Sequence, residues 1–348
     1  MLVLKTLQLL YKLRKGKISA ISYNITNRCN CRCLMCSVWK HDVRELKIDE
    51  QRKIFTHLKK NGLILVEITG GEPLLRKDLF EFTSLLDELG FLYTINTNGL
   101  LLDEDKIIRL NECKNLLQIA ISLDSLDEKK YEMLRGVDGF SILMKNIELL
   151  RKSTNKTIKC SMTISRENYK EFENMVVWIK KNNFFLSVFP VNNGAEFYHR
   201  SDNSLFEDNP PEVINEIANL FQEIAKKRRK GEPFWEFSEF YERCKDYLLK
   251  NELPDCGASR LFMDLHADGS IAVCNDFPSF ANLLDIPFEE AMKIAENQMK
   301  KIKSCYTNTP CYYTCSYNIA FIAEKPFRYL LETMKVMGVL RILERLWN

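Results

Sequence analysis

Four cysteines lie within eight residues near the start of the chain, and they are the clearest sign of chemistry in the sequence. Residues 27–36 read NRCNCRCLMC, in which Cys29, Cys33 and Cys36 have the spacing C-x3-C-x2-C. Three thiolates can bind three irons of a 4Fe–4S cluster and leave the fourth iron open to another ligand. Cys31 creates a second pattern, C-x-C-x-C-x2-C, which would also suit zinc. The spacing alone leaves both metals open.

Five further cysteines lie in the last quarter of the chain: Cys256, Cys274, Cys305, Cys311 and Cys315. The chain has twelve cysteines in all. Clusters of thiols in a long chain without a secretory signal favour metal binding over a disulfide scaffold. The other three, Cys113, Cys160 and Cys244, are widely spaced, and we expect them to be small buried hydrophobic residues.

Short apolar strands alternate with amphipathic helices from residue 18 to residue 195. Strands are expected at 18–26, 63–69, 92–96, 117–122, 158–164 and 185–190. Helices are expected at 49–61, 78–89, 103–111, 140–153 and 169–182. This alternation predicts a parallel sheet covered by helices, either doubly wound or a full or partial barrel. In each case ligands bind at the carboxyl ends of the strands, and the first cysteine cluster follows the first strand.

Three more motifs follow the ends of later strands. They are ITGGEPL at 68–74, TINTNG at 94–99, and SLDS at 122–125 followed by YEMLRG at 131–136. Together with the C-x3-C-x2-C segment, these motifs resemble the radical S-adenosylmethionine (SAM) family over about residues 18–195. A lone GGE or an Asn-Gly pair would be an ordinary turn signal. Their order, at the ends of successive strands, makes the resemblance specific.

The resemblance implies a partial (β/α)6 TIM-like barrel that holds a 4Fe–4S cluster on Cys29, Cys33 and Cys36. It also implies reductive cleavage of SAM to a 5′-deoxyadenosyl radical, which abstracts hydrogen from an inert C–H bond. The residues expected to contact SAM or its surroundings are Met35, Gly70, Gly71, Glu72, Asn96, Asn98, Ser122, Arg135 and Pro190. The two glycines would let the backbone approach the ligand, and the Glu72 carboxylate suits a cationic amino group. Asp124 is expected on the substrate side, and it is the only candidate catalytic residue beyond the cluster.

The C-terminal cysteines resemble the SPASM/twitch extensions of radical SAM enzymes, which hold auxiliary clusters. This resemblance implies a small cysteine-rich α+β extension at 256–325, with a hairpin that turns at 267–270. We expect one auxiliary 4Fe–4S cluster, bound by Cys256, Cys274 and Cys315, with Cys311 or Cys305 as the fourth ligand. The alternative is a structural zinc site. Residues 196–255 are expected to form a helical linker between the two domains.

Both ends of the chain read as basic amphipathic helices, at 1–17 and 326–348. Such helices suit a membrane interface, although each could instead pack its apolar side on the protein. The net charge is +3, which does not favour nucleic acid as a partner. No apolar run is long enough for a transmembrane helix and no secretory signal is evident. We therefore expect a cytoplasmic protein, docked peripherally on the membrane if the terminal helices bind lipid.

These features lead to three functional hypotheses. The first is a radical SAM enzyme that modifies a hydrophobic or lipid substrate, for example by C–C bond formation, with reduced ferredoxin or flavodoxin as electron donor. The second is a SPASM-type peptide or protein maturase. Fewer than twenty residues precede the first expected strand, which disfavours a fused peptide-recognition domain. The third is a non-catalytic iron–sulfur or zinc module.

Overall fold

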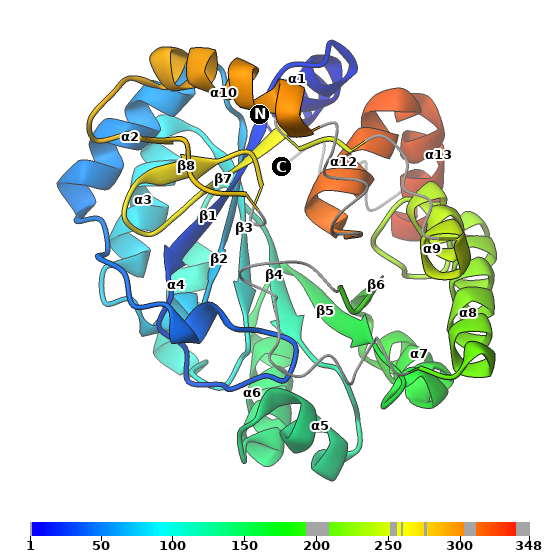
Figure 1. Cartoon of the computed structure of the whole chain (residues 1–348). Coiled ribbons are helices and arrows are strands. Elements are labelled where there is room, and N and C mark those ends of the chain that lie inside the picture. The colour runs from blue at the N-terminus through cyan, green and yellow to red at the C-terminus, as the bar shows by residue number, and fades with distance from the viewer. Residues whose placement is uncertain are drawn as a thin grey trace.

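A nine-stranded sheet organises the protein, in the order β6-β5-β4-β3-β2-β1-β7-β8-β9. The structure is a computed structural model that describes residues 2–192, 209–250, 256–258, 260–274, 277–302 and 311–338. Its first six strands are parallel, and their bounds are β1 (Ala20–Thr26), β2 (Leu65–Gly70), β3 (Leu92–Thr97), β4 (Leu116–Ser122), β5 (Thr157–Ile164) and β6 (Phe185–Pro190). Figure 1 shows these strands curving around a common axis inside a ring of helices. The partial barrel predicted from the sequence is confirmed.

Helices follow the strands and cover the outside of the sheet. They are α2 (Ile48–Lys60), α3 (Leu79–Leu89), α4 (Glu104–Glu112), α5 (Glu128–Arg135), α6 (Phe140–Ser153) and α7 (Phe172–Asn182). Short 3-10 turns stand at η1 (Val38–Lys40), η2 (Pro73–Leu75) and η3 (Tyr169–Glu171). Asp103 and Asp127 cap α4 and α5 by accepting hydrogen bonds from the first-turn amides. Helix α5 was not predicted as a helix from the sequence.

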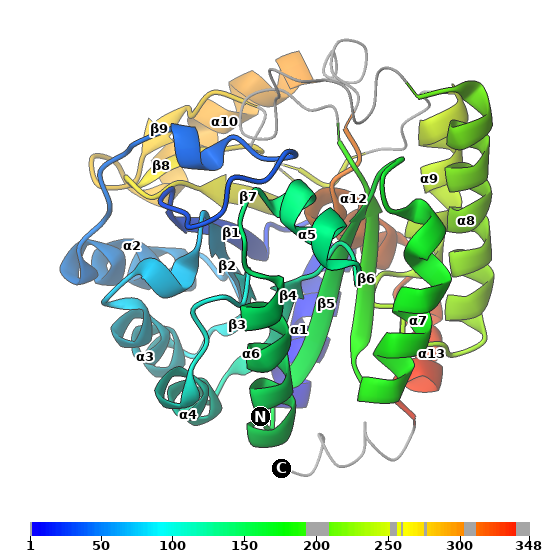
Figure 2. The same ribbon diagram turned by 90° about the horizontal axis from the view of Figure 1, so that it is seen from below.

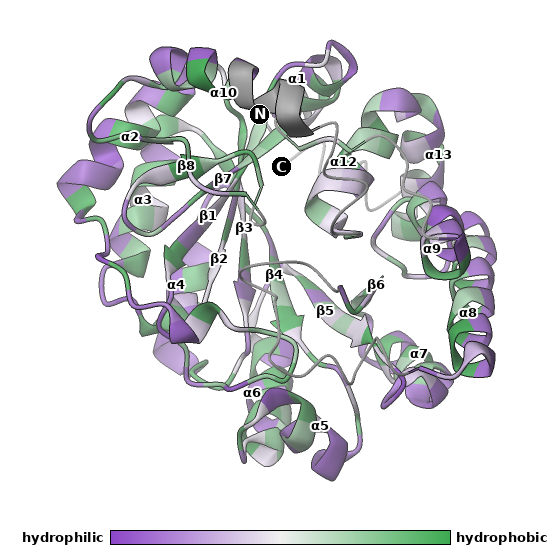
Figure 3. Ribbon diagram, viewed as in Figure 1, coloured by the Kyte–Doolittle hydropathy of each residue, from purple (hydrophilic) through white to green (hydrophobic). Residues whose placement is uncertain are grey.

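The core lies between the outer face of the sheet and these helices. Every residue of β1 is buried. Tyr23 of β1 packs its ring 5.3 Å from the rings of both Phe55 of α2 and Phe82 of α3. The outer faces of the helices are hydrophilic and their inner faces hydrophobic, as Figure 3 shows around the ring. Burial of these faces fixes the strands whose carboxyl ends carry the motifs.

The C-terminal part of the chain continues the same sheet. Strand β7 (Phe262–Leu265) pairs in parallel with β1, so that Asp264 lies beside Ser22. Strands β8 (Ser270–Ala272) and β9 (Ala281–Asn282) follow in antiparallel order and complete the expected hairpin. The cysteine-rich extension is therefore hydrogen-bonded directly to the first strand of the barrel.

The described residues of the second half of the chain contain five more helices: α8 (Pro211–Arg229), α9 (Ser238–Lys250), α10 (Phe288–Ile302), α12 (Thr314–Glu324) and α13 (Pro326–Met337). Residues 233–235, just before α9, run beside β6. There Leu186 donates its amide to Pro233 O, at 2.8 Å, and accepts from the Trp235 amide at 2.9 Å. Helices α10 and α12 lie with β7, β8 and β9 in the segment 256–325, where an α+β extension was expected.

The two terminal helices differ in how they meet the protein. Helix α1 (Leu2–Arg14) buries Leu10 and Leu13, and Lys12 donates to the carbonyl of Gly62 at 2.6 Å. Figure 2 shows the N-terminus at one end of the barrel, opposite the loop that follows β1 and carries the first four cysteines. Helix α13, in contrast, leaves Phe327 81% and Leu331 61% exposed. No helix in the described residues is both long and apolar enough to span a bilayer.

Candidate active site

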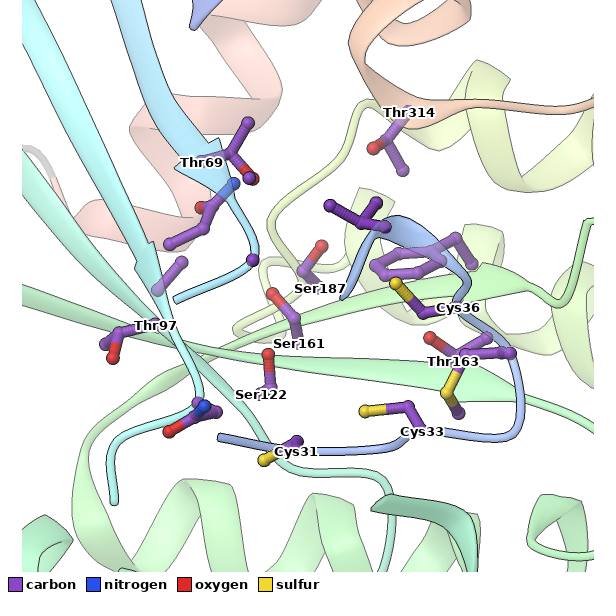
Figure 4. Close-up of a pocket in the computed structure, with 18 of the residues that line it drawn as sticks. Cys31, Cys33, Cys36, Thr69, Thr97, Ser122, Ser161, Thr163, Ser187 and Thr314 are labelled. Carbon is purple, nitrogen blue, oxygen red and sulfur yellow. The ribbon is translucent and has the colours of Figure 1, made fainter. Parts of the chain in front are cut away.

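The first cysteine cluster forms a loop that leaves the carboxyl end of β1. Cys29, Cys31, Cys33 and Cys36 all line one cavity, and Figure 4 shows the last three along this loop. The loop is held by its own backbone: the amide of Cys36 donates to Cys33 O at 3.2 Å. Trp39 closes the turn by donating its indole N–H to Cys36 O at 3.0 Å.

Helix α5 braces this loop from the side. The amides of Arg32 and Leu34 donate to the last carbonyls of α5, at 3.0 Å each. Gly136 ends the helix with φ +60°, and a Cβ atom there would lie 2.2 Å from Arg32 O. The YEMLRG motif therefore supplies a helix end and a glycine that permit close contact with the cysteine loop.

The thiols of the loop interact with one another. A hydrogen bond with Cys31 is the largest influence that lowers the pKa of Cys33, to about 6, and the Arg135 charge lowers it further. Hydrogen bonding to Cys31 also lowers the pKa of Cys29. Burial raises the pKa of Cys36 to about 12. Cys31 thus stands among the three candidate iron ligands and shares hydrogen bonds with two of them.

The cavity beside the loop has a volume of about 270 Å³, close to the small end of ligand sites at roughly 300–1,000 Å³. The SAM-contact candidates that line it are Met35, Gly70, Gly71, Asn96, Asn98, Ser122, Arg135 and Pro190. A Cβ on Gly71 would lie 2.2 Å from Arg28 O. The glycine pair therefore lets the end of β2 approach the backbone of the cysteine loop.

Glu72 has a different position from the other candidates, because it is completely buried and does not line the cavity. Its carboxylate accepts hydrogen bonds from the Asn98 amide at 2.7 Å and from the Thr97 hydroxyl at 2.8 Å. Burial raises the pKa of Glu72 to about 6, although these hydrogen bonds oppose the rise. The carboxylate therefore ties the ends of β2 and β3 together.

Asp124 is also completely buried and lies behind the cavity wall. Its Oδ2 is 2.7 Å from Nη2 of Arg135, and its Oδ1 accepts from the Thr163 amide at 2.8 Å. Burial raises the pKa of Asp124, while the Arg135 charge opposes the rise. Arg135 Nη1 lies 3.8 Å from the Cys33 sulfur. Asp124 thus positions a cation that lines the cavity and also reaches the cysteine loop.

Several residues that face the barrel interior, here called the lumen, were not predicted from the sequence. Ser161 and Ser187 are two of them: they continue from the predicted Ser122 in register across β4, β5 and β6, and Figure 4 shows the three hydroxyls in a row. Trp39 and Lys159 also line the cavity. A signal was present in β5, where polar residues alternate with apolar ones and so indicate a strand face that does not pack in the core.

The C-terminal cysteines are only partly described. Cys315, at the start of α12, lines the same cavity as the first cluster. Burial raises the pKa of Cys315. A Cβ on Gly257 would lie 2.6 Å from Ser316 O, so the backbone next to Cys256 is in close contact with the backbone next to Cys315. Cys274 follows β8 and Cys311 precedes α12, whereas Cys305 lies outside the described residues. Cys113, Cys160 and Cys244 are buried, as expected of packing residues.

Comparison with known proteins agrees with this geometry. Residues 23–179 match the model of the Radical SAM superfamily. These residues therefore carry a radical SAM domain. Members of the superfamily are enzymes that use SAM and a 4Fe–4S cluster.

Two relatives indicate the range of named activities among similar sequences. Fe-coproporphyrin III synthase from Methanosarcina barkeri is 29% identical over 166 residues, which are 47% of this chain and 41% of the relative. GTP 3′,8-cyclase from Thermodesulfovibrio yellowstonii is 28% identical over 232 residues, which are 62% of this chain and 70% of the relative. The chain therefore spans less than half of the first relative's length.

Solved structures share the fold. SuiB from Streptococcus suis, bound to the precursor peptide SuiA, superimposes with a TM-score of 0.63 at 18% identity and covers 81% of this chain and 67% of that one. The anSMEcpe structure with bound AdoMet and a peptide gives a TM-score of 0.63 at 17% identity, over 91% of this chain and 99% of that one.

The site suits the cofactors of a radical SAM protein. Thiols are the usual ligands of iron–sulfur clusters, and Cys29, Cys33 and Cys36 meet at one cavity wall. Asn96, Ser122 and Arg135 place polar side chains along the same cavity. No three His, Cys, Asp or Glu side chains in the described residues are grouped around a single metal position.

Proposed function

We propose that this chain is a radical SAM enzyme that modifies a polar substrate in the lumen of its barrel. One observation carries the proposal: the cysteine loop and the row of serine hydroxyls face the same cavity. Cys29, Cys33 and Cys36 would hold the cluster. When bound, the reduced cluster supplies the electron that splits SAM and so generates the radical that removes hydrogen from a substrate C–H bond.

The residues of the chain bind and shield the reactants. Arg135 offers its guanidinium to the SAM carboxylate, and Asp124 holds that guanidinium in place. Met35 and Trp39 cover the cavity from the loop side and exclude water. Asn96 donates to Glu67 at 2.9 Å, which orients both side chains on the opposite wall. We infer that a reduced ferredoxin or flavodoxin delivers the electron, because Arg28 and Leu34 expose the loop to solvent.

SAM cleavage by anaerobically reconstituted protein tests this function. We expect dithionite-reduced enzyme to form 5′-deoxyadenosine and methionine from SAM, measured by liquid chromatography and mass spectrometry. Cys33→Ala should abolish this product. Cys113→Ala should retain it, since Cys113 lies at the end of α4, away from the lumen. Wild-type protein that holds iron and binds SAM but forms no 5′-deoxyadenosine would overturn the proposal.

We also propose that the C-terminal cysteines hold one auxiliary 4Fe–4S cluster. The close backbone contact next to Cys256 and Cys315 supports it, and Cys274 with Cys311 or Cys305 would complete the ligand set. Two clusters predict about eight irons per chain, and Cys315→Ser should leave about four. Cys244→Ser is the control, since Cys244 is buried among the helices. Equal iron in Cys315→Ser and Cys244→Ser would exclude Cys315 as a ligand.

Peptides are a second candidate substrate class. The peptide complexes of the two structural neighbours favour it, and the serine hydroxyls of the lumen could bind backbone amides as well as small molecules. Deuterium transfer between substrate and 5′-deoxyadenosine would separate the classes when polar metabolites and peptides are supplied in turn. A peptide fraction that alone yields labelled product would assign a maturase.

The exposed side of α13 supports peripheral membrane contact, which the lipid hypothesis needs. Phe327, Leu331 and Met334 recur at helical spacing and are all exposed. Co-sedimentation with anionic vesicles tests this contact, and Phe327→Ser combined with Leu331→Ser should abolish it. Ser122 and Ser161 line the lumen together with Met35 and Trp39, so membrane contact would locate the enzyme without identifying its substrate.

A further inference from the structure

Lys159 is a buried cation inside the barrel. It stands in the middle of β5, is 8% exposed and lines the cavity. Its neighbours in register are Ala120 of β4 and Phe185 of β6, neither of which carries a polar side chain. The methyl group of Ala120 leaves space in the lumen beside the lysine.

No carboxylate of the described residues forms an ion pair with this cation. Within the described part of the chain, no Asp or Glu oxygen lies within 4.0 Å of Lys159 Nζ. The nearest described aromatic partner is Trp235, whose ring centroid is 5.7 Å from Nζ. A contact at that distance is weak, so it leaves the ammonium group at the cavity able to bind an anion.

The acidic groups near the lumen are engaged elsewhere. Asp124 pairs with Arg135, and Glu236 accepts from the hydroxyls of Ser187 and Tyr241. Glu67 stands across the lumen on β2 and accepts from Asn96. The cavity therefore has one wall with an acidic group and an opposite wall with a cation.

Ser161 adds a donor beside Lys159. The two residues are two positions apart on β5, so their side chains leave the same face of the sheet. Ser161 also lines the cavity, and no described residue accepts its hydroxyl proton. An ammonium and a neighbouring hydroxyl together suit the oxygens of a carboxylate or a phosphate.

We propose that Lys159 and Ser161 form an anion subsite that binds a carboxylate or phosphate of the substrate. This inference rests on the proposed function, and it identifies the substrate as an anionic molecule. Its anionic group lies at the β5 wall, while the cysteine loop lies at the carboxyl ends of the strands. Lys159 is thereby a specificity residue that orients the substrate toward the loop.

Anion binding to the reconstituted holoenzyme tests the subsite. Inorganic phosphate and glutarate are titrated separately by calorimetry, in the presence of SAM, so that the two arms distinguish a phosphate from a carboxylate. Lys159→Met should lower the affinity for the anion by roughly ten- to a hundredfold, because a charged hydrogen bond is lost. Lys159→Arg should retain most of the affinity. Lys145→Met, on the exposed side of α6, is the matched control and should bind as the wild type does.

The outcomes separate the subsite from its alternatives. Binding of neither anion to the wild type, or equal binding by Lys159→Met, would overturn the proposal. Loss of SAM affinity in Lys159→Met would also overturn it, because Lys159 would then belong to the SAM site. Absence of 5′-deoxyadenosine formation in the wild type would refute the proposed function instead, and the anion titration would still report on the subsite.

Discussion

Asp124 Oδ2 lies 2.7 Å from Arg135 Nη2, in an ion pair whose carboxylate is fully buried. Arg135 also reaches to within 3.8 Å of the Cys33 sulfur, so a single guanidinium joins the end of β4 to the cysteine loop. This relationship assigns Asp124 a positioning role, since its carboxylate does not line the cavity.

Asp124→Asn should weaken both the fold and SAM binding. Asparagine keeps the shape and the acceptor for the Thr163 amide but leaves the Arg135 charge unpaired. Breaking a buried pair costs about 3–5 kcal/mol of unfolding free energy. Urea unfolding and SAM calorimetry measure the two effects. Glu148→Gln, which breaks an exposed pair on α6, should change neither, and a neutral Asp124→Asn would contradict the positioning role.

Gly136→Ala should displace the cysteine loop and reduce its iron content. The added Cβ would lie 2.2 Å from Arg32 O, and the backbone there has φ +60°. Gly338→Ala is a matched control, because Gly338 has φ +69° but no atom within 4 Å of its Cβ position. Both variants bear the strain of a left-handed alanine, about 1–2 kcal/mol. Iron analysis should show a loss of about four irons only in Gly136→Ala. Equal iron in both variants would mean that the close contact between α5 and the cysteine loop is not needed to bind the cluster.

Glu72 should make stability depend on pH in a defined direction. Burial raises the pKa of Glu72 from 4.5 to about 6, so the folded protein holds this proton more tightly than the unfolded chain does. This proton adds about 2 kcal/mol to the free energy of unfolding. The added stability is fully present below about pH 4.5 and is lost as the pH rises through 6. Relative to Glu72→Gln, the wild type should lose this amount of unfolding free energy over that interval.

Urea unfolding at a series of pH values measures this difference. Glu81→Gln, on the exposed side of α3, serves as the control and should follow the wild type throughout. Parallel stability curves for the wild type and Glu72→Gln would mean that the buried carboxyl does not titrate in this range.

Local sequence was sufficient to predict the strands and the cysteine loop, because apolar runs and thiol spacing are short-range signals. Local sequence did not identify Lys159 and Ser161 as site residues, because whether they line the cavity depends on which face of β5 lies toward the lumen. Helix α5 escaped prediction because eight mostly polar residues carry little apolar periodicity. The hydrogen bonds from Thr97 and Asn98 to Glu72 depend on how close the ends of β2 and β3 come, which only tertiary structure determines.

The pairing of β7 with β1 has a consequence for biosynthesis. One edge of β1 stays without its partner until residue 265 has been translated, more than two hundred residues later. At about 5–20 residues per second, a nascent chain would expose that edge, next to the cysteine loop, for roughly 10 to 50 seconds. During this interval residues 20–23 of β1 present unpaired backbone groups, to which a strand of another chain could bind until β7 has been made.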